Sequence, residues 1–224
     1  MARFTEIGTA TIPGKGTQLR LLQRNDEFSI RIAGTTGELM NSRIHGSEDA
    51  LATLACERIA DQPSPRVLIG GLGMGFTLAA ALSALGEDAR VTVAELVSEV
   101  EGWNRGALGA AAGNPLNDPR ASVHIGDVAK LLRNSDGEWD AILLDVDNGP
   151  EGLTRRENNW IYSPAGIAAA QKSLRPEGVL AYWSAGPEHA FTERLRRAGL
   201  SVEPVTVRAL RPGKGARHVI WLAW

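Results

Sequence analysis

Residues 66–82 read RVLIGGLGMGFTLAAAL, and this stretch decides the fold of the chain. Residues 67–69 are apolar and partly β-branched, which predicts a short buried strand. Glycines follow at positions 70, 71, 73 and 75, and a tight turn is expected because glycine adopts positive φ angles without a Cβ clash. The Ala, Leu and Thr residues after Phe76 predict a helix. A strand, a glycine turn and a helix in this order begin a nucleotide-binding βαβ unit, in which the first N–H groups of the helix point toward the ligand.

The spacing of the glycines indicates which nucleotide is bound. In the G-x-G-x-x-G fingerprint of NAD-binding proteins, the third glycine would fall at position 76, which is Phe76. The spacing of Gly71, Gly73 and Gly75 is instead G-x-G-x-G. This pattern is typical of class I S-adenosylmethionine (SAM) enzymes, in which no pyrophosphate has to be held. An ordinary tight turn is the alternative interpretation of the glycines.

Two acidic residues follow the next two predicted strands. Residues 91–94 predict a strand, and Glu95 comes about 20 residues after the last glycine, where this fold places a carboxylate that binds the ribose hydroxyls. The alternative is that Glu95 is a solvated strand end. Residues 121–125 predict the third strand, and the carboxylate of Asp127 after it could accept the exocyclic amine of an adenine. Asp127 could also cap the predicted helix at 128–132, and both roles can hold together.

The fourth predicted strand, residues 139–145, is nearly all apolar and therefore buried on both faces. Its end carries Asp145, Asp147 and Asn148. Ligands bind beyond the carboxyl ends of such strands, and buried carboxylates are costly unless they are used. The alternative is a turn that favours Asp, Asn and Gly. A long polar loop, residues 151–162, follows, and such loops commonly cover a substrate.

The remaining segments complete an α/β fold. Residues 1–45 predict a small antiparallel sheet, with strands at 19–23 and 28–32. The last two strands, 201–207 and 218–224, predict a hairpin that puts one antiparallel strand into an otherwise parallel sheet. We therefore expect a seven-stranded Rossmann-like class I SAM-methyltransferase fold with a small N-terminal antiparallel β-sheet. The expected domains are a β-strand subdomain at 1–45 and a nucleoside-binding catalytic domain at 46–224.

Helix boundaries follow from capping residues. Ser47 is expected to cap a helix that runs to about residue 60, and Ser163 to cap a helix that begins at Pro164. A helix at 188–197 is expected to be closed by a glycine. The Ala/Gly-rich residues 106–113 are expected to be flexible.

Composition limits the classes of function. The 224 residues are 43% hydrophobic and 22% charged, and the net charge of −2 gives no reason to expect a nucleic-acid or membrane partner. The single cysteine, Cys56, excludes an internal disulfide, lies in a helical apolar pattern and is expected in the core. The four histidines have no metal-ligand spacing, so no metal is expected. The N-terminus has no apolar signal segment and no apolar run reaches about 18 residues, so a cytoplasmic protein is expected.

The order and spacing of these motifs resemble the spermidine synthase (polyamine aminopropyltransferase) family, within the class I methyltransferase-like superfamily. The resemblance covers nearly the whole length. It implies that Gly71, Gly73 and Gly75 line the nucleoside, that Glu95 binds the ribose and that Asp127 binds the adenine amine. It also allows a homodimer, because family members often dimerise through the N-terminal strands.

The resemblance implies the catalytic residues as well. Asp145 matches the aspartate that orients and helps to deprotonate the attacking amine, with Asp147 as a second carboxylate of the same loop. Tyr162 matches an aromatic residue that borders the amine channel. Glu48 lies where the family places a polar residue near the amino group of the donor.

Two departures from the family pattern leave the donor open. The family motif reads G-G-G-D-G-G, in which the Asp holds the ammonium of decarboxylated SAM, and here that position is Met74. The family loop reads D-S-x-D-P, whereas this chain has D-V-D-N-G-P, which displaces the second Asp. The donor, a co-substrate, is therefore SAM or decarboxylated SAM.

Three functions are compatible with these residues. The first is aminopropyl transfer from decarboxylated SAM to a small-molecule amine, that is, a polyamine or diamine. The second is SAM-dependent methylation of a small molecule, and the third is nucleoside binding without catalysis. Arg155 and Arg156 would suit an anionic acceptor, whereas Asp147, Glu151 and Trp160 would suit a cationic one.

Overall fold

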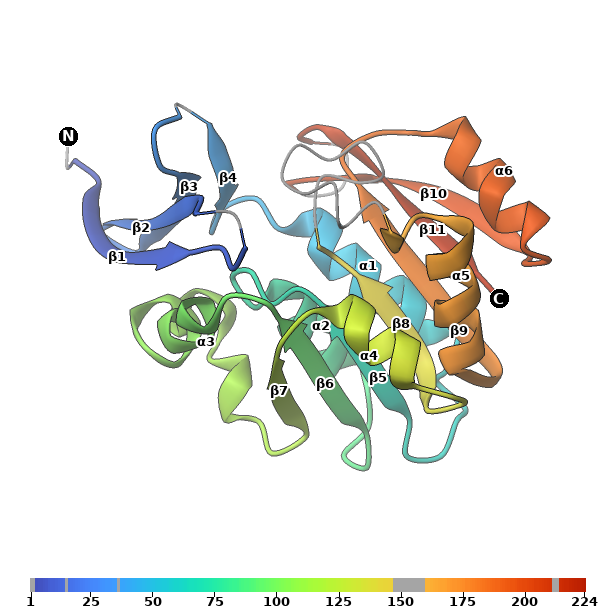
Figure 1. Ribbon diagram of the computed structural model, residues 1–224. Helices are drawn as coiled ribbons and strands as arrows, with labels where there is room; N and C mark the ends of the chain where they lie inside the picture. Colours follow the sequence, from blue (N-terminus) through green and yellow to red (C-terminus); the bar gives the residue numbers. More distant parts are fainter. Residues whose placement is uncertain (1–2, 15, 36, 147–159, 211–213) are drawn as a thin grey trace.

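The computed structural model describes residues 3–14, 16–35, 37–146, 160–210 and 214–224. Figure 1 shows a small sheet placed beside a larger sheet that has helices on both faces. The strands of the small sheet are β1 (Thr5–Thr11), β2 (Gln18–Arg24), β3 (Glu27–Ile32) and β4 (Glu38–Asn41). The strands of the large sheet are β5 (Arg66–Gly70), β6 (Arg90–Glu95), β7 (Ala121–Ile125), β8 (Trp139–Leu144), β9 (Leu174–Ser184), β10 (Val202–Arg208) and β11 (Arg217–Ala223).

The α-helices of the described segments are α1 (Gly46–Glu57), α2 (Phe76–Ala84), α3 (Ser98–Arg105), α4 (Val128–Asn134), α5 (Pro164–Ser173) and α6 (His189–Arg197). Two short 3₁₀ helices, η1 (Ala107–Ala112) and η2 (Pro115–Asn117), connect α3 to β7. The helices alternate with the strands of the large sheet, as the sequence pattern predicts for an α/β fold.

The large sheet has the order β10-β11-β9-β8-β5-β6-β7. Strands β7, β6, β5, β8 and β9 run parallel, and β11 pairs antiparallel with both β9 and β10. The terminal hairpin therefore inserts its second strand next to β9. The seven-stranded sheet and the separate antiparallel sheet at the N-terminus are confirmed.

The apolar strands of the large sheet fill two cores because neighbouring side chains point to opposite faces. On β5, Val67 and Ile69 join the cluster that contains α1 and α2, whereas Leu68 joins the cluster that contains α4, α5 and α6. All three side chains are fully buried. Cys56 of α1 is also buried in the first cluster, as predicted.

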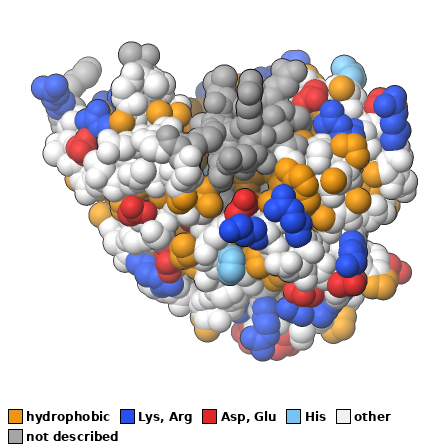
Figure 2. All heavy atoms as spheres, in the orientation of Figure 1, with side chains coloured by type: hydrophobic (Ala, Val, Ile, Leu, Met, Phe, Trp, Pro, Cys, Tyr) orange, Lys and Arg blue, Asp and Glu red, His pale blue; other side chains and the backbone are white. Residues whose placement is uncertain are grey.

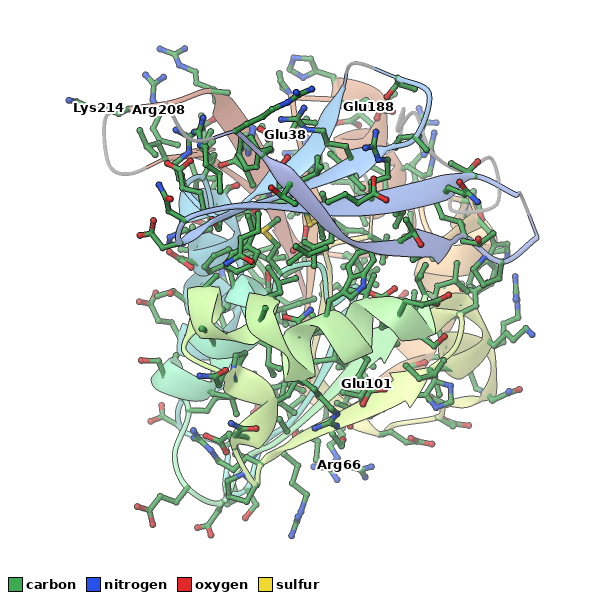
Figure 3. The ribbon with its side chains drawn as sticks, turned by 90° about the vertical axis from the view of Figure 1, so that its left-hand side faces the viewer. Glu38, Arg66, Glu101, Glu188, Arg208 and Lys214 are labelled. Atoms are coloured by element: carbon green, nitrogen blue, oxygen red, sulfur yellow. The ribbon has the colours of Figure 1, made fainter. Side chains whose placement is uncertain are left out.

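The N-terminal sheet covers the edge at which the parallel strands end. Six buried apolar side chains of this N-terminal region belong to the same cluster as α1 and α2: Ala10, Ile12, Leu19, Leu21, Phe28 and Ile30. In Figure 3, Glu38 of β4 lies at one end of the molecule and Arg66, where β5 begins, lies at the other. The carboxyl end of β5 therefore points toward the N-terminal sheet.

Several local expectations differ from the structure. Helix α1 begins at Gly46 with His45 as N-cap, so Ser47 lies inside the first turn and its hydroxyl contacts Glu48 and His218 instead of capping the helix. Residues 107–112 form a 3₁₀ helix rather than a flexible segment. Ser163 accepts a hydrogen bond from the Gly166 N–H and caps α5 as predicted.

The surface carries charges of both signs. Figure 2 shows Lys, Arg, Asp and Glu side chains interspersed with hydrophobic ones over the face seen in Figure 1. Within the described segments, no helix combines the length and the apolar character that a membrane span requires.

Candidate active site

A cavity of about 200 Å³ lies between the N-terminal sheet and the carboxyl ends of β5, β6, β7 and β8. Several of the residues singled out in the sequence line this cavity: Glu48, Gly71, Gly73, Glu95, Asp127 and Asp145. The N-terminal sheet contributes the aliphatic side chains of Ile12, Leu19, Ile30, Leu39 and Met40. The structure thus brings together residues that are spread over most of the chain.

The sheet topology explains this convergence. From β5 the chain moves to β6 and β7 on one side and later returns to β8 on the other side. Parallel strands end at the same edge, and the change of direction opens a crevice there. The residues that directly follow β5 and β8 therefore face each other, although 74 residues separate Gly71 from Asp145 in the chain.

Gly71 allows the closest approach in the site. Its φ is +93°, and a Cβ at this position would collide with the backbone carbonyl of Asp145. The Gly71 N–H donates to the carbonyl of Ala94, with an N···O distance of 2.9 Å. Glycine at this position therefore permits both the left-handed backbone and the contact between the ends of β5 and β8.

The other two glycines of the motif differ in their surroundings. Gly73, with φ +52°, lines the cavity. Gly75, with φ +85°, is the N-cap of α2, and a Cβ there would meet the Oδ1 atom of Asn104 at 3.0 Å. Gly75 is absent from the cavity lining that the structure describes. It shapes the turn that precedes α2.

Asn104 holds the glycine turn from outside, and sequence reasoning missed it. This side chain of α3 is 1% exposed, and its Nδ2 atom donates to the carbonyls of Gly73 and Val100, each at 2.9 Å. The signal in the sequence was an amide side chain one helical turn after Val100, on the buried face of the helix that follows Glu95.

Glu95 is fixed by backbone amides. Its side chain is 8% exposed, and its two carboxylate oxygens accept hydrogen bonds from the N–H groups of Leu72 (2.9 Å) and Val97 (2.8 Å). Burial raises the pKa of Glu95, and the backbone hydrogen bonds oppose this shift. The backbone N–H groups of Gly73 and Leu96 also lower the pKa of Glu95, so backbone donors surround this carboxylate, which lines the cavity.

Asp127 combines two roles. Its Oδ1 atom accepts a hydrogen bond from the Ala129 N–H at 2.9 Å, so the expectation that it caps α4 is confirmed. The same residue lines the cavity. Within the described residues, no hydrogen bond to its Oδ2 atom is observed.

Asp145 and Glu48 form a pair of interacting carboxyls. The Oδ2 atom of Asp145 accepts a hydrogen bond from the Thr77 hydroxyl at 2.8 Å, and burial raises the pKa of Asp145 to about 6. Burial and the negative charge of Asp145 together raise the pKa of Glu48 to about 7. Two like charges close together favour holding a proton or a cation between them. Such paired, perturbed acids in a cavity are typical of functional sites.

Glu48 is supported from behind by two residues that the sequence analysis did not assign to the site. The Ser47 hydroxyl donates to Oε2 of Glu48 at 2.6 Å, and Nδ1 of His218 lies 2.9 Å from the same hydroxyl oxygen. The ring of His218 packs edge-on against Trp183, with centroids 4.8 Å apart. Trp183 lines the cavity.

Two of the residues discussed in the sequence analysis, Tyr162 and Met74, lie in the core. Tyr162 is 2% exposed, and its ring packs against Tyr182 and edge-on against Phe191, with centroids 5.9 and 5.4 Å away. The expectation that Tyr162 borders the amine channel does not fit this placement, because the ring fills the core beside α6. Met74 is 3% exposed and also belongs to the core. Asp147 lies outside the described residues.

Of the loop residues that the sequence analysis considered for binding the acceptor, only some are described by the structure. Arg155, Arg156 and Glu151 lie outside the described residues. Trp160 is described, and the guanidinium of Arg133 lies over its ring at 3.9 Å. This contact ties Trp160 to α4.

The ionisable side chains that the structure describes in the cavity lining are all acidic. Among the lining residues that the structure describes, the ionisable side chains are the four carboxyls of Glu48, Glu95, Asp127 and Asp145, without a Lys, Arg or His. The described part of the chain also holds no cluster of His, Cys, Asp and Glu suited to a metal ion. A cationic nucleoside such as a sulfonium compound fits this set of groups, because its charge meets acids and its sugar and base meet hydrogen-bond acceptors.

Comparison with known proteins agrees with this picture. A polyamine aminopropyltransferase of Prochlorococcus marinus (strain AS9601) is 28% identical over 129 residues, which make up 57% of this chain and 43% of that protein. The chain thus spans less than half of the length of this curated relative. No family model matches the chain.

Solved structures share the fold over nearly the whole chain. A crystal structure of spermidine synthase in complex with the transition state analogue AdoDATO matches with a TM-score of 0.72, and spermidine synthase from Thermotoga maritima matches with 0.74. Each is 18% identical, and each match covers 97% of this chain, with 71% and 72% of the respective relative. The chain is therefore spermidine-synthase-like in fold and, over part of its length, in sequence.

Proposed function

We propose that this chain is a transferase that moves the aminopropyl group of decarboxylated SAM to a small-molecule amine. The observation that carries the proposal is the Glu48–Asp145 pair in a cavity whose described lining has acids and no basic side chain. The donor brings a sulfonium and an ammonium, and the acceptor arrives as an ammonium, so all the reacting groups are cations. The partial sequence similarity to a polyamine aminopropyltransferase supports the same chemistry.

The acidic side chains that line the cavity also favour decarboxylated SAM over SAM. SAM carries a carboxylate that would have to enter a cavity lined by Glu48, Glu95 and Asp145. Two like charges about 4 Å apart repel by about 4 kcal/mol at an effective dielectric constant near 20. The decarboxylated donor avoids this repulsion.

In the proposed reaction, Asp145 accepts a proton from the acceptor ammonium. The neutral amine then attacks the carbon next to the sulfonium, the C–S bond breaks, and its electron pair stays on sulfur. A neutral thioether and a protonated secondary amine result, so one proton is released in each turnover. The protein contributes alignment of the two substrates and a base for this proton.

Methyl transfer from SAM is the second candidate, and Met74 favours it. Its buried side chain leaves no carboxylate at the position where the family holds the donor ammonium. Glu48, which lines the cavity, is then a described acid available to this ammonium.

One product analysis separates the candidates. The purified chain is incubated with decarboxylated SAM or with SAM, together with putrescine, and the nucleoside products are identified by mass spectrometry. Methylthioadenosine formed from decarboxylated SAM supports aminopropyl transfer. S-adenosylhomocysteine formed from SAM would instead support methyl transfer. Binding of methylthioadenosine without turnover of either donor would leave a nucleoside-binding protein.

A further inference from the structure

The proposed reaction releases one proton inside the cavity. Asp145 receives this proton in the proposed reaction and interacts with Glu48, so the pair must release the proton before the next turnover. Asp145 is held by Thr77, whose hydroxyl donates to it. Thr77 is 3% exposed, so this contact leads into the core. The proton therefore needs another way out.

Glu48 offers such a way through two hydrogen bonds in series. Ser47 is fully buried, and its hydroxyl lies 2.6 Å from Oε2 of Glu48 and 2.9 Å from Nδ1 of His218. His218 is half-buried at the start of β11, whereas Ser47 and Glu48 lie in the first turn of α1. The three groups thus connect the cavity with the surface near the β10–β11 hairpin, whose end carries Lys214 and Arg208 in Figure 3.

We propose that Ser47 and His218 form the path by which the proton of the acceptor amine leaves the Glu48–Asp145 pair for solvent. The inference rests on the proposed function for the source of the proton. Ser47 and His218 act through Glu48, so they are positioning residues rather than catalytic ones.

The path works because every group on it can both donate and accept. With Glu48 ionised, Nδ1–H of His218 donates to the Ser47 oxygen, and the Ser47 hydroxyl donates to Glu48. With Glu48 protonated, both hydrogen bonds reverse, and Nε2 of His218 carries the hydrogen of the imidazole. A proton that enters at Glu48 then leaves from Nε2 to water, no charge stays behind, and nothing is oxidised or reduced.

The state of His218 suits this role. Burial lowers the pKa of His218, so the ring is kept neutral and has one donor and one acceptor nitrogen. Trp183 fixes the plane of the ring by its edge-on contact. If His218 had a purely structural role, its hydrogen bond to Ser47 would be enough, and a nitrogen that gains and loses a proton would not be needed.

The first measurement does not depend on activity. The full chain is labelled with ¹⁵N-histidine, and the His218 ring signals are identified by their loss in His218→Asn. Ser47→Ala is expected to shift the Nδ1 signal of His218 and to leave those of His45, His124 and His189 in place. An unchanged His218 signal in Ser47→Ala would overturn the path.

The second measurement uses His218→Asn in the transferase reaction. The asparagine amide can still donate to Ser47, so Glu48 stays in position, but the side chain cannot pass a proton on. We expect kcat to fall on the order of 100-fold, with KM for both substrates within about 2-fold. Added imidazole is expected to restore turnover in His218→Ala, and the exposed His189→Asn serves as the matched control.

Each outcome decides one point. Wild-type kcat in His218→Asn overturns the path and leaves the transferase intact. If the chain turns over neither donor, the proposed function is wrong, and the role of Ser47 and His218 in proton release is wrong as well. The ¹⁵N spectra then still decide whether His218 is coupled to Ser47.

Discussion

The backbone carbonyl of Asp145 lies too close to the position of a Cβ atom on Gly71 for both to fit. Gly71 after β5 and Asp145 after β8 are therefore in direct contact, without an intervening side chain. The Asp145 N–H also donates to the carbonyl of Gly70 at 2.9 Å. The carboxyl of Asp145 is thus placed by the same contact that shapes the expected nucleoside site.

Gly71→Ala is expected to lower the free energy of unfolding by at least about 2 kcal/mol, because the new Cβ combines a left-handed backbone with a clash against Asp145. Urea denaturation measures the loss. Gly86→Ala is the control, since an added Cβ there meets no described atom within 4 Å. Equal stability of the two variants would show that the ends of β5 and β8 are not in close contact.

Asp145→Asn is expected to reduce kcat on the order of 100- to 10,000-fold, because the amide keeps the shape of the side chain but cannot take up a proton. Binding of methylthioadenosine, measured by calorimetry, should stay within about 3-fold, since Glu95 and Asp127 are unchanged. Asp136→Asn, at an exposed ion pair with Lys172, is the control for loss of one negative charge. Retained turnover in Asp145→Asn would remove this carboxyl from the reaction.

The acid pair should make stability depend on pH. In the folded chain the pKa values of Glu48 and Asp145 are raised from 4.5 to about 7 and from 3.8 to about 6. The folded state binds these protons more tightly, so their stabilising contribution is complete below about pH 4 and is lost as the pH rises to about 7.

Glu48→Gln removes one of these groups. Relative to the wild type, the variant is expected to gain roughly 1–3 kcal/mol in the free energy of unfolding as the pH rises from about 5 to about 8. Urea denaturation at a series of pH values measures this difference, and the exposed Glu99→Gln is the control. A constant difference between Glu48→Gln and the wild type would contradict the burial of a carboxyl pair.

Asn104→Ala is expected to destabilise the chain by about 1–3 kcal/mol, because the carbonyls of Gly73 and Val100 lose their buried donor. Freed from Asn104, the glycine turn should also bind methylthioadenosine about 10-fold more weakly. Both quantities can be compared with Asn134→Ala, at the exposed end of α4. Unchanged nucleoside affinity would mean that Asn104 supports α3 alone.

At Tyr162 the family resemblance implies a residue of the amine channel, whereas the observed packing shows a core residue. Tyr162→Ala is expected to lower the free energy of unfolding by about 3–5 kcal/mol, because its ring fills the core beside Tyr182 and Phe191. Tyr162→Phe keeps the ring and should leave KM for the acceptor amine within about 2-fold. A large rise in that KM with unchanged stability would place the Tyr162 hydroxyl in the amine channel after all.

Part of this site could be predicted from the sequence because it depends on local rules. The glycines at 71, 73 and 75 mark a turn that few other residues allow, and hydrophobic periodicity marks the strands around it. Once parallel strands are recognised, Glu95, Asp127 and Asp145 must end near one another, because parallel strands finish at a common edge. The seven-stranded sheet and the capping roles of Asp127 and Ser163 followed from the same kind of reasoning.

Tertiary structure alone decided which side chains meet across long stretches of chain. Thr77 contacts Asp145 over 68 residues, and Ser47 contacts His218 over 171 residues. No local pattern records such contacts, because capping and periodicity report a residue's own turn and face. For that reason the capping pattern predicted a helix cap at Ser47, whereas the channel role of Tyr162 was implied by the family resemblance. Packing instead placed the serine behind Glu48 and the tyrosine in the core, since burial of each side chain depends on partners that the fold supplies.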